Sequence, residues 1–210
     1  MLADGIIFDI DGTLWNATPS IRESWRLYAL DHGMPFDKNL EEFKACMGKP
    51  MDAFAEAVFG KLTEEQLRTD IPAMLQFENE YLATHPGDIY PGVQETIRAL
   101  SEKLTVTIVS NCQAGYIETF IRAAVLDECV KDWESFGATG LQKADNIRLV
   151  VERNGFIHPV YVGDIQADAN AAHQAGVPII HAAYGFGTIS DADGRIHAFP
   201  ELLTLVEPAV

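Results

Sequence analysis

Two aspartates that follow an apolar segment are the first residues in this sequence that could do chemistry. Asp9 and Asp11 lie in the string FDIDGTL, residues 8–14, at the end of the apolar run that starts at Gly5. Residues two apart on an extended segment point to the same side, so two carboxylates there repel each other. A divalent cation explains the pair, because hard cations bind carboxylate and carbonyl oxygens. Gly12 lets the backbone turn tightly and bring its N–H close to a reacting group. The alternative is an ordinary Asp-Gly turn.

A second acidic pair follows another apolar segment. The string VGDIQAD, residues 162–168, places Asp164 in a loop and Asp168 in the first turn of an expected helix. Both carboxylates can therefore face one site. Helix capping explains either aspartate alone, because Asp near a helix N-terminus stabilises the helix by roughly 0.5–2 kcal/mol. Capping accounts less well for two aspartates that follow a glycine.

Two further positions carry groups that suit an anion. Ser110 and Asn111 end an apolar segment and precede an expected helix, where a hydroxyl and free backbone N–H groups bind anions. A plain helix N-cap is the alternative. Lys143 opens the helix after the Gly-rich turn 137–140, although a lysine at a helix start opposes the helix dipole. An anion or carboxylate that Lys143 must neutralise explains it, and a surface lysine is the alternative.

Short β-type segments alternate with helical ones and position these residues. Strands are expected at residues 5–10, 105–110, 159–163 and 177–181, which are nearly continuous in apolarity, as strands buried on both faces are. Helices are expected at residues 93–101, 115–124, 144–154 and 166–175. This alternation predicts an α/β fold with a doubly wound, mostly parallel sheet, whose ligands bind at the carboxyl ends of the strands. All the polar groups above lie at such ends.

One long stretch interrupts the alternation. Helices are expected at residues 19–32, 38–47, 51–59 and 63–83, with no convincing strand among them. A helical block of about 70 residues is much longer than an ordinary connection between strand and helix. We predict an all-helical cap domain at residues 15–86, inserted in a core domain formed by residues 1–14 and 87–210. The aromatic residues Trp15, Trp25, Phe54 and Phe59 are expected in the cap core, and a pocket lined by them is the alternative.

The expected contact loop of the cap is the string MGKP, residues 47–50. Glycine and proline interrupt the helix there, and Lys49 could meet a second anionic group of a substrate. A surface lysine in a turn between two helices explains the string equally well.

The composition excludes several classes of partner. The chain has 210 residues, with 15 Lys and Arg against 31 Asp and Glu, which gives a net charge of −16. Such a chain repels polyphosphates at long range, so neither nucleic acid nor an anionic membrane is an expected partner. No apolar run approaches the roughly 20 residues of a membrane span. The three cysteines show no paired spacing, and we predict a cytoplasmic monomer or homodimer.

Together, the four motifs resemble the haloacid dehalogenase superfamily. DxDGT, a serine that ends a strand, a lysine at a helix start and GDxxxD occur in the family's order, over about residues 6–187. The insert directly after the first motif is similar to that of the helical-cap subgroup, which includes phosphoglycolate phosphatases, pyrophosphatases and β-phosphoglucomutases.

The resemblance implies a role for each acidic residue. Asp9 would attack phosphorus and form an aspartyl-phosphate. Asp11 would protonate the leaving oxygen and later deprotonate the attacking water. Mg²⁺ would be held by Asp9, the main-chain carbonyl of Asp11 and Asp164, with Asp168 binding a coordinated water or supporting the other ligands.

The resemblance also implies how the transferring group is bound. Ser110, the N–H groups of Gly12 and Asn111, and Lys143 would hold phosphoryl oxygens, and Lys143 would also pair with the nucleophile. The expected activity is a Mg²⁺-dependent phosphatase, phosphoglycolate-phosphatase-like, that acts on a small phosphorylated metabolite.

Several alternatives remain open at this point. A β-phosphoglucomutase-like mutase or a pyrophosphatase would use the same core residues. Dehalogenase chemistry is disfavoured because Asp11 is present. Phosphonatase chemistry would need a lysine in the cap that forms a Schiff base, and neither Lys44 nor Lys49 is a secure candidate. A phospho-accepting signalling module also pairs acidic residues, a hydroxyl and a lysine, but such modules are shorter and have no cap. A catalytically silent binding relative would not need every motif position to be filled.

Overall fold

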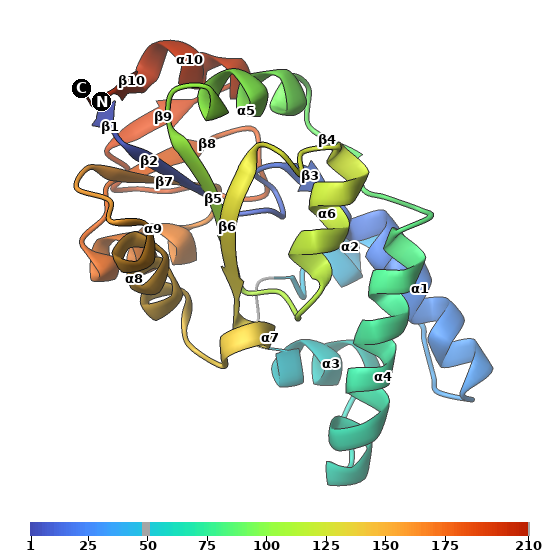
Figure 1. Ribbon diagram of the computed structural model, residues 1–210. Helices are drawn as coiled ribbons and strands as arrows, with labels where there is room; N and C mark the ends of the chain where they lie inside the picture. Colours follow the sequence, from blue (N-terminus) through green and yellow to red (C-terminus); the bar gives the residue numbers. More distant parts are fainter. Residues whose placement is uncertain (48–50, 210) are drawn as a thin grey trace. The chain divides into compact units, whose positions relative to one another are not determined.

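The structure, a computed structural model, describes residues 1–47 and 51–209. The chain divides into two compact units (Figure 1). Met1–Asn16 and Asp88–Val210 form the core unit, and Ala17–Gly87 form the helical unit.

A six-stranded parallel sheet forms the centre of the core unit, in the order β6-β5-β2-β7-β8-β9 (Figure 1). Its strands are β2 (Gly5–Phe8), β5 (Thr105–Ser110), β6 (Val130–Ser135), β7 (Pro159–Gly163), β8 (Ile179–Ala182) and β9 (Gly194–Ile196). Two short pairs lie outside it: β1 (Leu2–Ala3) with β10 (Glu207–Pro208), and β3 (Trp15–Asn16) with β4 (Asp88–Ile89). The predicted parallel α/β fold is confirmed.

Helices cover both faces of this sheet (Figure 1). On one face lie α8 (Lys143–Asn154) and α9 (Gln166–Ala175), which also pack on each other. On the other lie α5 (Val93–Ser101), α6 (Tyr116–Ala124) and α10 (Leu202–Leu205), the last preceded by a 3-10 turn at Phe199–Glu201. The short α7 (Phe136–Thr139) follows β6 directly. Strands β2, β5, β7 and β8 are therefore shielded from water on both sides, as their apolar sequences require.

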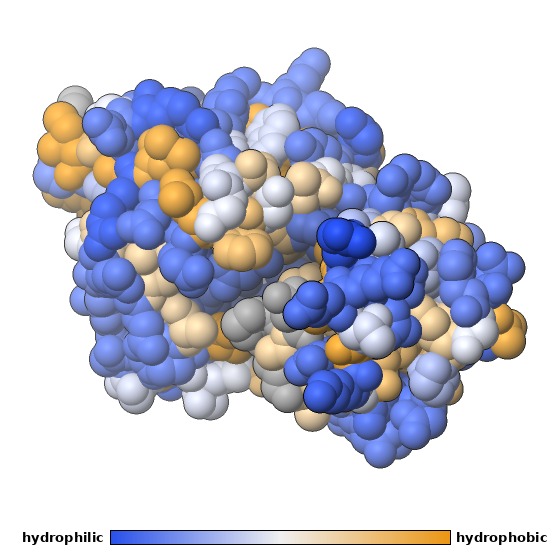
Figure 2. Space-filling view, turned by 90° about the horizontal axis from the view of Figure 1, so that it is seen from below, coloured by the Kyte–Doolittle hydropathy of each residue, from blue (hydrophilic) through white to orange (hydrophobic). Residues whose placement is uncertain are grey.

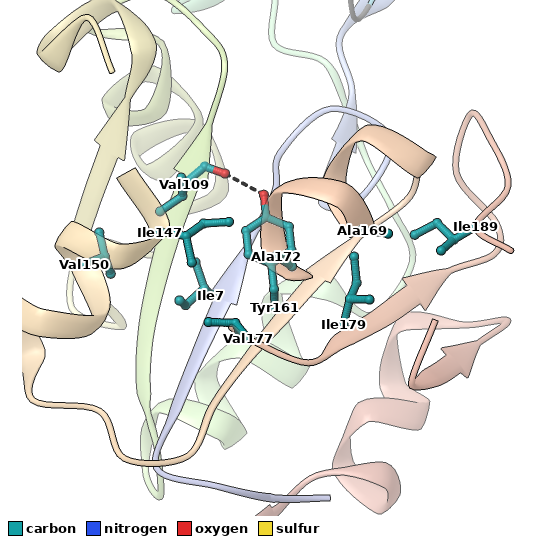
Figure 3. Packing of buried hydrophobic residues seen from close by; sticks show 10 residues of the cluster. All are labelled: Ile7, Val109, Ile147, Val150, Tyr161, Ala169, Ala172, Val177, Ile179 and Ile189. Atoms are coloured by element: carbon teal, nitrogen blue, oxygen red, sulfur yellow. Dashed lines mark hydrogen bonds between the residues drawn. The ribbon is translucent and has the colours of Figure 1, made fainter. Parts of the chain in front are cut away.

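The face covered by α8 and α9 holds a cluster of buried apolar side chains (Figure 3). Ile7 and Tyr161 come from the sheet, Ile147 comes from α8 and Ala172 from α9. The hydroxyl of Tyr161 donates a hydrogen bond to the carbonyl of Val109 at 2.8 Å, so the one polar group of the ring has a partner inside the core. This packing fixes the strands whose ends carry the motifs.

The helical unit comprises α1 (Thr18–Asp31), α2 (Leu40–Lys44), α3 (Met51–Phe59) and α4 (Glu64–Leu82). Trp25 lies at its centre, with ring centroids of Phe43, Phe54 and Phe59 within 5.8 Å. The indole N–H of Trp25 donates to the buried carboxylate of Glu78. Trp25, Phe54 and Phe59 thus form the hydrophobic centre of the helical unit, as predicted for the cap. Trp15 instead belongs to the α/β core unit, where its ring centroid lies 5.1 Å from that of Phe120.

Several element boundaries differ from the predicted ones. The first strand ends at Phe8 rather than residue 10, and α2 is confined to Leu40–Lys44, where Asn39 caps its first turn. Strand β6 was not predicted. Its sequence VKDWES carries three charged residues, which suits a strand at the sheet edge with one strand neighbour.

Hydrophilic side chains cover most of the face drawn in Figure 2, with apolar residues in smaller groups. Within residues 1–47 and 51–209, no helix combines the length and the apolarity that crossing a membrane requires.

The end of α6 stores backbone strain that a substitution can release. Val125 adopts φ +53° in the left-handed region, where a β-branched side chain is disfavoured, and its side chain is exposed. We expect Val125→Gly to raise the free energy of unfolding by about 0.5–1 kcal/mol, because glycine removes the clash although it gains freedom in the unfolded chain. Denaturant unfolding measures the change.

The matched reverse exchange is Gly155→Val at the end of α8. Gly155 has φ +67°, and a Cβ there would meet no atom within 4 Å, so only the backbone conformation is penalised. This variant should lose stability. A Val125→Gly protein that unfolds at lower denaturant than the wild type would contradict the strain at this position.

Candidate active site

The motif residues converge at the carboxyl ends of three neighbouring strands. Phe8 of β2 is in register with Ile108 of β5 and Val162 of β7. Asp9 follows β2, and its N–H donates to the carbonyl of Val162 at 2.9 Å. Ser110 ends β5 and Asp164 follows β7, so the first, second and fourth motifs lie side by side at one sheet edge.

The ammonium group of Lys143 links the segment after β2 to the first turn of α9. Its Nζ lies 2.9 Å from Oδ1 of Asp9 and 2.6 Å from Oδ1 of Asp168. All three side chains are at least nine-tenths buried. Burial alone would lower the pKa of Lys143, but Asp168 and Asp9 outweigh it and hold the pKa well above its usual value. The ammonium at the start of α8 is therefore charged, and carboxylates explain its place, as the sequence predicted.

Asp168 uses both of its carboxylate oxygens within the protein. Oδ1 accepts from Lys143, and Oδ2 accepts the N–H groups of Asp164 and Ile165, each at 3.1 Å. Its side chain packs so closely on β7 that a Cβ on Gly163 would lie 2.6 Å from the Cβ of Asp168. Asp168 therefore orients the lysine and shapes the loop that carries Asp164.

Asp164 is held by a turn near the end of the chain. Its Oδ2 accepts the N–H of Phe186 at 2.7 Å. Backbone from two segments packs directly on this carboxylate, since a Cβ on Gly12 would lie 2.1 Å from Oδ2 and one on Gly185 would lie 2.4 Å from the Cβ of Asp164. Gly12 also has φ +82°. Both glycines are thus required by the close approach of their backbones.

The buried carboxylates are poorly neutralised by protein groups alone. Burial, followed by the charges of Asp168 and Asp9, raises the pKa of Asp164 to about 8. Burial also raises the pKa of Asp9 to about 6, although Lys143 opposes the shift. Ligand atoms of Asp9, Asp164 and Asp168 lie within 4.8 Å of one another. Three carboxylates facing one ammonium fit a hard divalent cation such as Mg²⁺. Because both oxygens of Asp168 already accept hydrogen bonds within the protein, Asp9 and Asp164 are the carboxylates suited to bind the ion.

Asp11 has a partner that the motifs do not reveal. Its side chain is partly exposed, and its Oδ1 accepts a hydrogen bond from the hydroxyl of Tyr116 at 2.7 Å. Tyr116 is the first residue of α6, which follows the loop after Ser110. The sequence analysis missed it, because no motif spacing links a tyrosine at a helix start to an acid more than 100 residues earlier.

The remaining predicted residues occupy different settings. Ser110 is buried at the end of β5, and Asn111 is exposed in the loop after it. The predicted contact residue Lys49 lies outside the described residues. The structure thus brings Asp9, Lys143, Asp164 and Asp168 into one cluster, and it holds Asp11 through Tyr116.

Comparison with known proteins identifies the family of this chain. The family model described as haloacid dehalogenase-like hydrolase matches residues 6–182, most of the chain. The chain belongs to this family. The phosphoglycolate phosphatase of Haemophilus influenzae (strain 86-028NP) is 26% identical over 220 residues, which cover 95% of this chain and 96% of that protein. That of Escherichia coli (strain K12) is 27% identical over 211 residues, 87% of this chain and 82% of that protein.

Solved structures show the same fold. A protein from Haemophilus somnus 129pt, described as a predicted phosphoglycolate phosphatase, superposes with a TM-score of 0.79 at 21% identity and covers 96% of this chain and 97% of its own. The haloacid dehalogenase-like family and the phosphatase class of enzyme, both predicted from the motifs, are confirmed.

The raised pKa of Asp164 predicts how the stability of the metal-free protein depends on pH. The folded-state pKa of about 8 lies above the unfolded value of 3.8, so the folded protein retains a proton that the unfolded chain releases. The stability that Asp164 contributes is therefore fully present below about pH 4 and is lost as pH rises towards 8; Asp9 contributes in the same direction up to about pH 6.

Asp164→Asn cannot ionise, so this variant should lose less stability over that range. In EDTA we expect its melting temperature at pH 8 to exceed that of the wild type by roughly 4 °C or more, with a smaller difference at pH 5. Excess Mg²⁺ should raise the melting temperature of the wild type more than that of the variant. The exposed Asp127→Asn serves as control. Parallel pH curves for wild type and Asp164→Asn would contradict the buried charge.

Proposed function

We propose that this hydrolase is a Mg²⁺-dependent phosphatase that cleaves a small phosphomonoester through an aspartyl-phosphate on Asp9. The supporting observation is the carboxylate of Asp9 at the end of β2, held by Lys143 at 2.9 Å within a buried acidic cluster. A carboxylate fixed in this way is a pre-positioned nucleophile, and the adjacent ammonium balances charge on a transferring phosphoryl group.

In the first proposed step, a carboxylate oxygen of Asp9 forms a bond to phosphorus. The bond from phosphorus to the leaving oxygen breaks, and that oxygen keeps the electron pair and takes a proton from Asp11. In the second step Asp11 takes a proton from water, whose oxygen attacks phosphorus and releases Asp9 and inorganic phosphate. Bound Mg²⁺, held by Asp9, Asp164 and the carbonyl of Asp11, would neutralise charge on the phosphoryl oxygens.

Lys143 and Ser110 have different tasks in this proposal. Lys143 keeps Asp9 oriented and contributes positive charge, and Asp168 keeps Lys143 in place from its other side. The Ser110 hydroxyl and the N–H groups of Gly12 and Asn111 would bind phosphoryl oxygens. This local positive charge is what allows a chain of net charge −16 to bind an anionic substrate.

For the substrate we propose a small phosphorylated metabolite of the phosphoglycolate type. The relatives that match nearly the whole chain are named phosphoglycolate phosphatases. A β-phosphoglucomutase-like mutase and a pyrophosphatase remain the alternatives, since they would use the same core residues. The phosphatase relatives and the filled motif positions weigh against a phospho-accepting module or a silent relative.

Other features stay predictions from the sequence. They are the role of the helical unit as a cap over the site, contact of Lys49 with a substrate, the monomeric or homodimeric state, and the cytoplasmic location.

Removal of the proposed nucleophile should abolish turnover. We expect Asp9→Asn to reduce release of p-nitrophenol from p-nitrophenyl phosphate by at least about 10³-fold, because an amide cannot form the acyl-phosphate. The wild type should lose activity in EDTA and regain it with Mg²⁺. The exposed Asp127→Asn is the matched control, and thermal unfolding checks that each variant folds. A folded Asp9→Asn protein with wild-type rates would refute the assignment of Asp9.

A substrate panel should separate the three candidate reactions. We expect kcat/KM to be higher for phosphoglycolate than for pyrophosphate or hexose phosphates, with inorganic phosphate as product, because specificity is expressed in kcat/KM. Phosphate release and sugar-phosphate isomerisation are measured in parallel. A β-glucose 1-phosphate substrate converted to an isomer without phosphate release would support the mutase instead.

A further inference from the structure

We propose that Tyr116 is a positioning residue for Asp11, whose carboxyl group it holds in the orientation needed to protonate the leaving oxygen. The inference rests on the proposed function and adds a residue outside the four motifs. It starts from the 2.7 Å hydrogen bond that the Tyr116 hydroxyl donates to Oδ1 of Asp11.

The ring of Tyr116 is itself firmly placed. It is 1% exposed and meets the indole of Trp15 edge-to-face, with ring centroids 5.6 Å apart. Gly115, with φ +87°, turns the chain into α6 directly before it. A phenol that is buried and packed in this way loses little further conformational entropy when its hydroxyl makes a hydrogen bond. The bond therefore restrains the carboxyl group of Asp11 relative to the core unit.

Burial does not by itself fix the carboxyl group of Asp11. Asp9, Asp164 and Asp168 are buried, whereas Asp11 is partly exposed on the turn after β2. A general acid must meet the leaving oxygen within hydrogen-bond reach, and small errors in placement are costly. With Oδ1 engaged by Tyr116, the proton passes from Oδ2 of Asp11 to the leaving oxygen as its bond to phosphorus breaks.

The leaving group provides a test that is specific to this role. An alkoxide is a strong base and must be protonated as it departs, whereas p-nitrophenolate is a weak base and departs without a proton. Misplacing Asp11 therefore slows cleavage of an alkyl phosphate more than cleavage of p-nitrophenyl phosphate. The ratio kcat/KM reports the steps up to loss of the leaving group, so the later hydrolysis of the aspartyl-phosphate does not affect it.

The variant is Tyr116→Phe, which keeps the ring and removes only the hydroxyl. We expect kcat/KM for phosphoglycolate to fall roughly 10–100-fold and that for p-nitrophenyl phosphate to fall less than about 3-fold. Competitive inhibition by inorganic phosphate should be unchanged, because phosphoryl binding does not use the hydroxyl. If phosphoglycolate is turned over too slowly, the alkyl phosphate most active in the panel replaces it.

Tyr184→Phe is the matched control. Its hydroxyl also donates a 2.7 Å hydrogen bond to the same loop, but to the backbone carbonyl of Thr13. Any loss in this variant should be equal for alkyl and aryl substrates, as for a purely structural bond. An equal loss, or no loss, in a folded Tyr116→Phe protein would overturn the proposed role of Tyr116. A wild type that releases no phosphate from any substrate would instead overturn the proposed function.

Discussion

The site depends on one buried ammonium shared by two carboxylates. Lys143, from the start of α8, contacts Asp9 after β2 and Asp168 in the first turn of α9, so three segments far apart in the chain meet at one charge. Removing one member of such a buried pair typically costs about 3–5 kcal/mol, because the other is left uncompensated. Here loss of the ammonium would leave three carboxylates facing one another. The fold therefore cannot lose this ammonium without penalty, and the same group orients the proposed nucleophile.

Close backbone packing makes this concentration of charge achievable. Gly12, Gly163 and Gly185 each lie where a Cβ would overlap Asp164 or Asp168. The absent side chains let backbone N–H groups reach the carboxylates, as those of Asp164, Ile165 and Phe186 do. Such donors contribute partial positive charge without adding another side chain. The pKa values of Asp9 and Asp164 are nevertheless raised, so these donors do not fully compensate the negative charge. A divalent cation would neutralise the remainder.

The sequence predicted the elements whose pattern is set by burial on both faces. Strands β5 and β7 and helices α5 and α9 have the predicted bounds, because continuous apolarity and helix caps are local signals. Edge strand β6 was not predicted, since the charged residues Lys131, Asp132 and Glu134 interrupt its apolar pattern. The motif residues were found by type and position, but Tyr116 was not, because its contact with Asp11 arises from how β2 and α6 pack. Local periodicity carries no information about such a pairing.

The two acids of the proposed reaction are held by chemically different donors, and the difference suits their tasks. Asp9 must stay ionised to attack, and the ammonium of Lys143, which can only donate hydrogen bonds, favours that form. Asp11 must carry a proton in one step and accept one in the next. A phenol donates to a carboxylate oxygen and equally to the carbonyl oxygen of a carboxylic acid, so Oδ1 can stay bound while Oδ2 gains or loses the proton. Tyr116 can therefore remain bound to Asp11 in both states, whereas an ammonium in its place would favour the ionised state and hinder the first proton transfer.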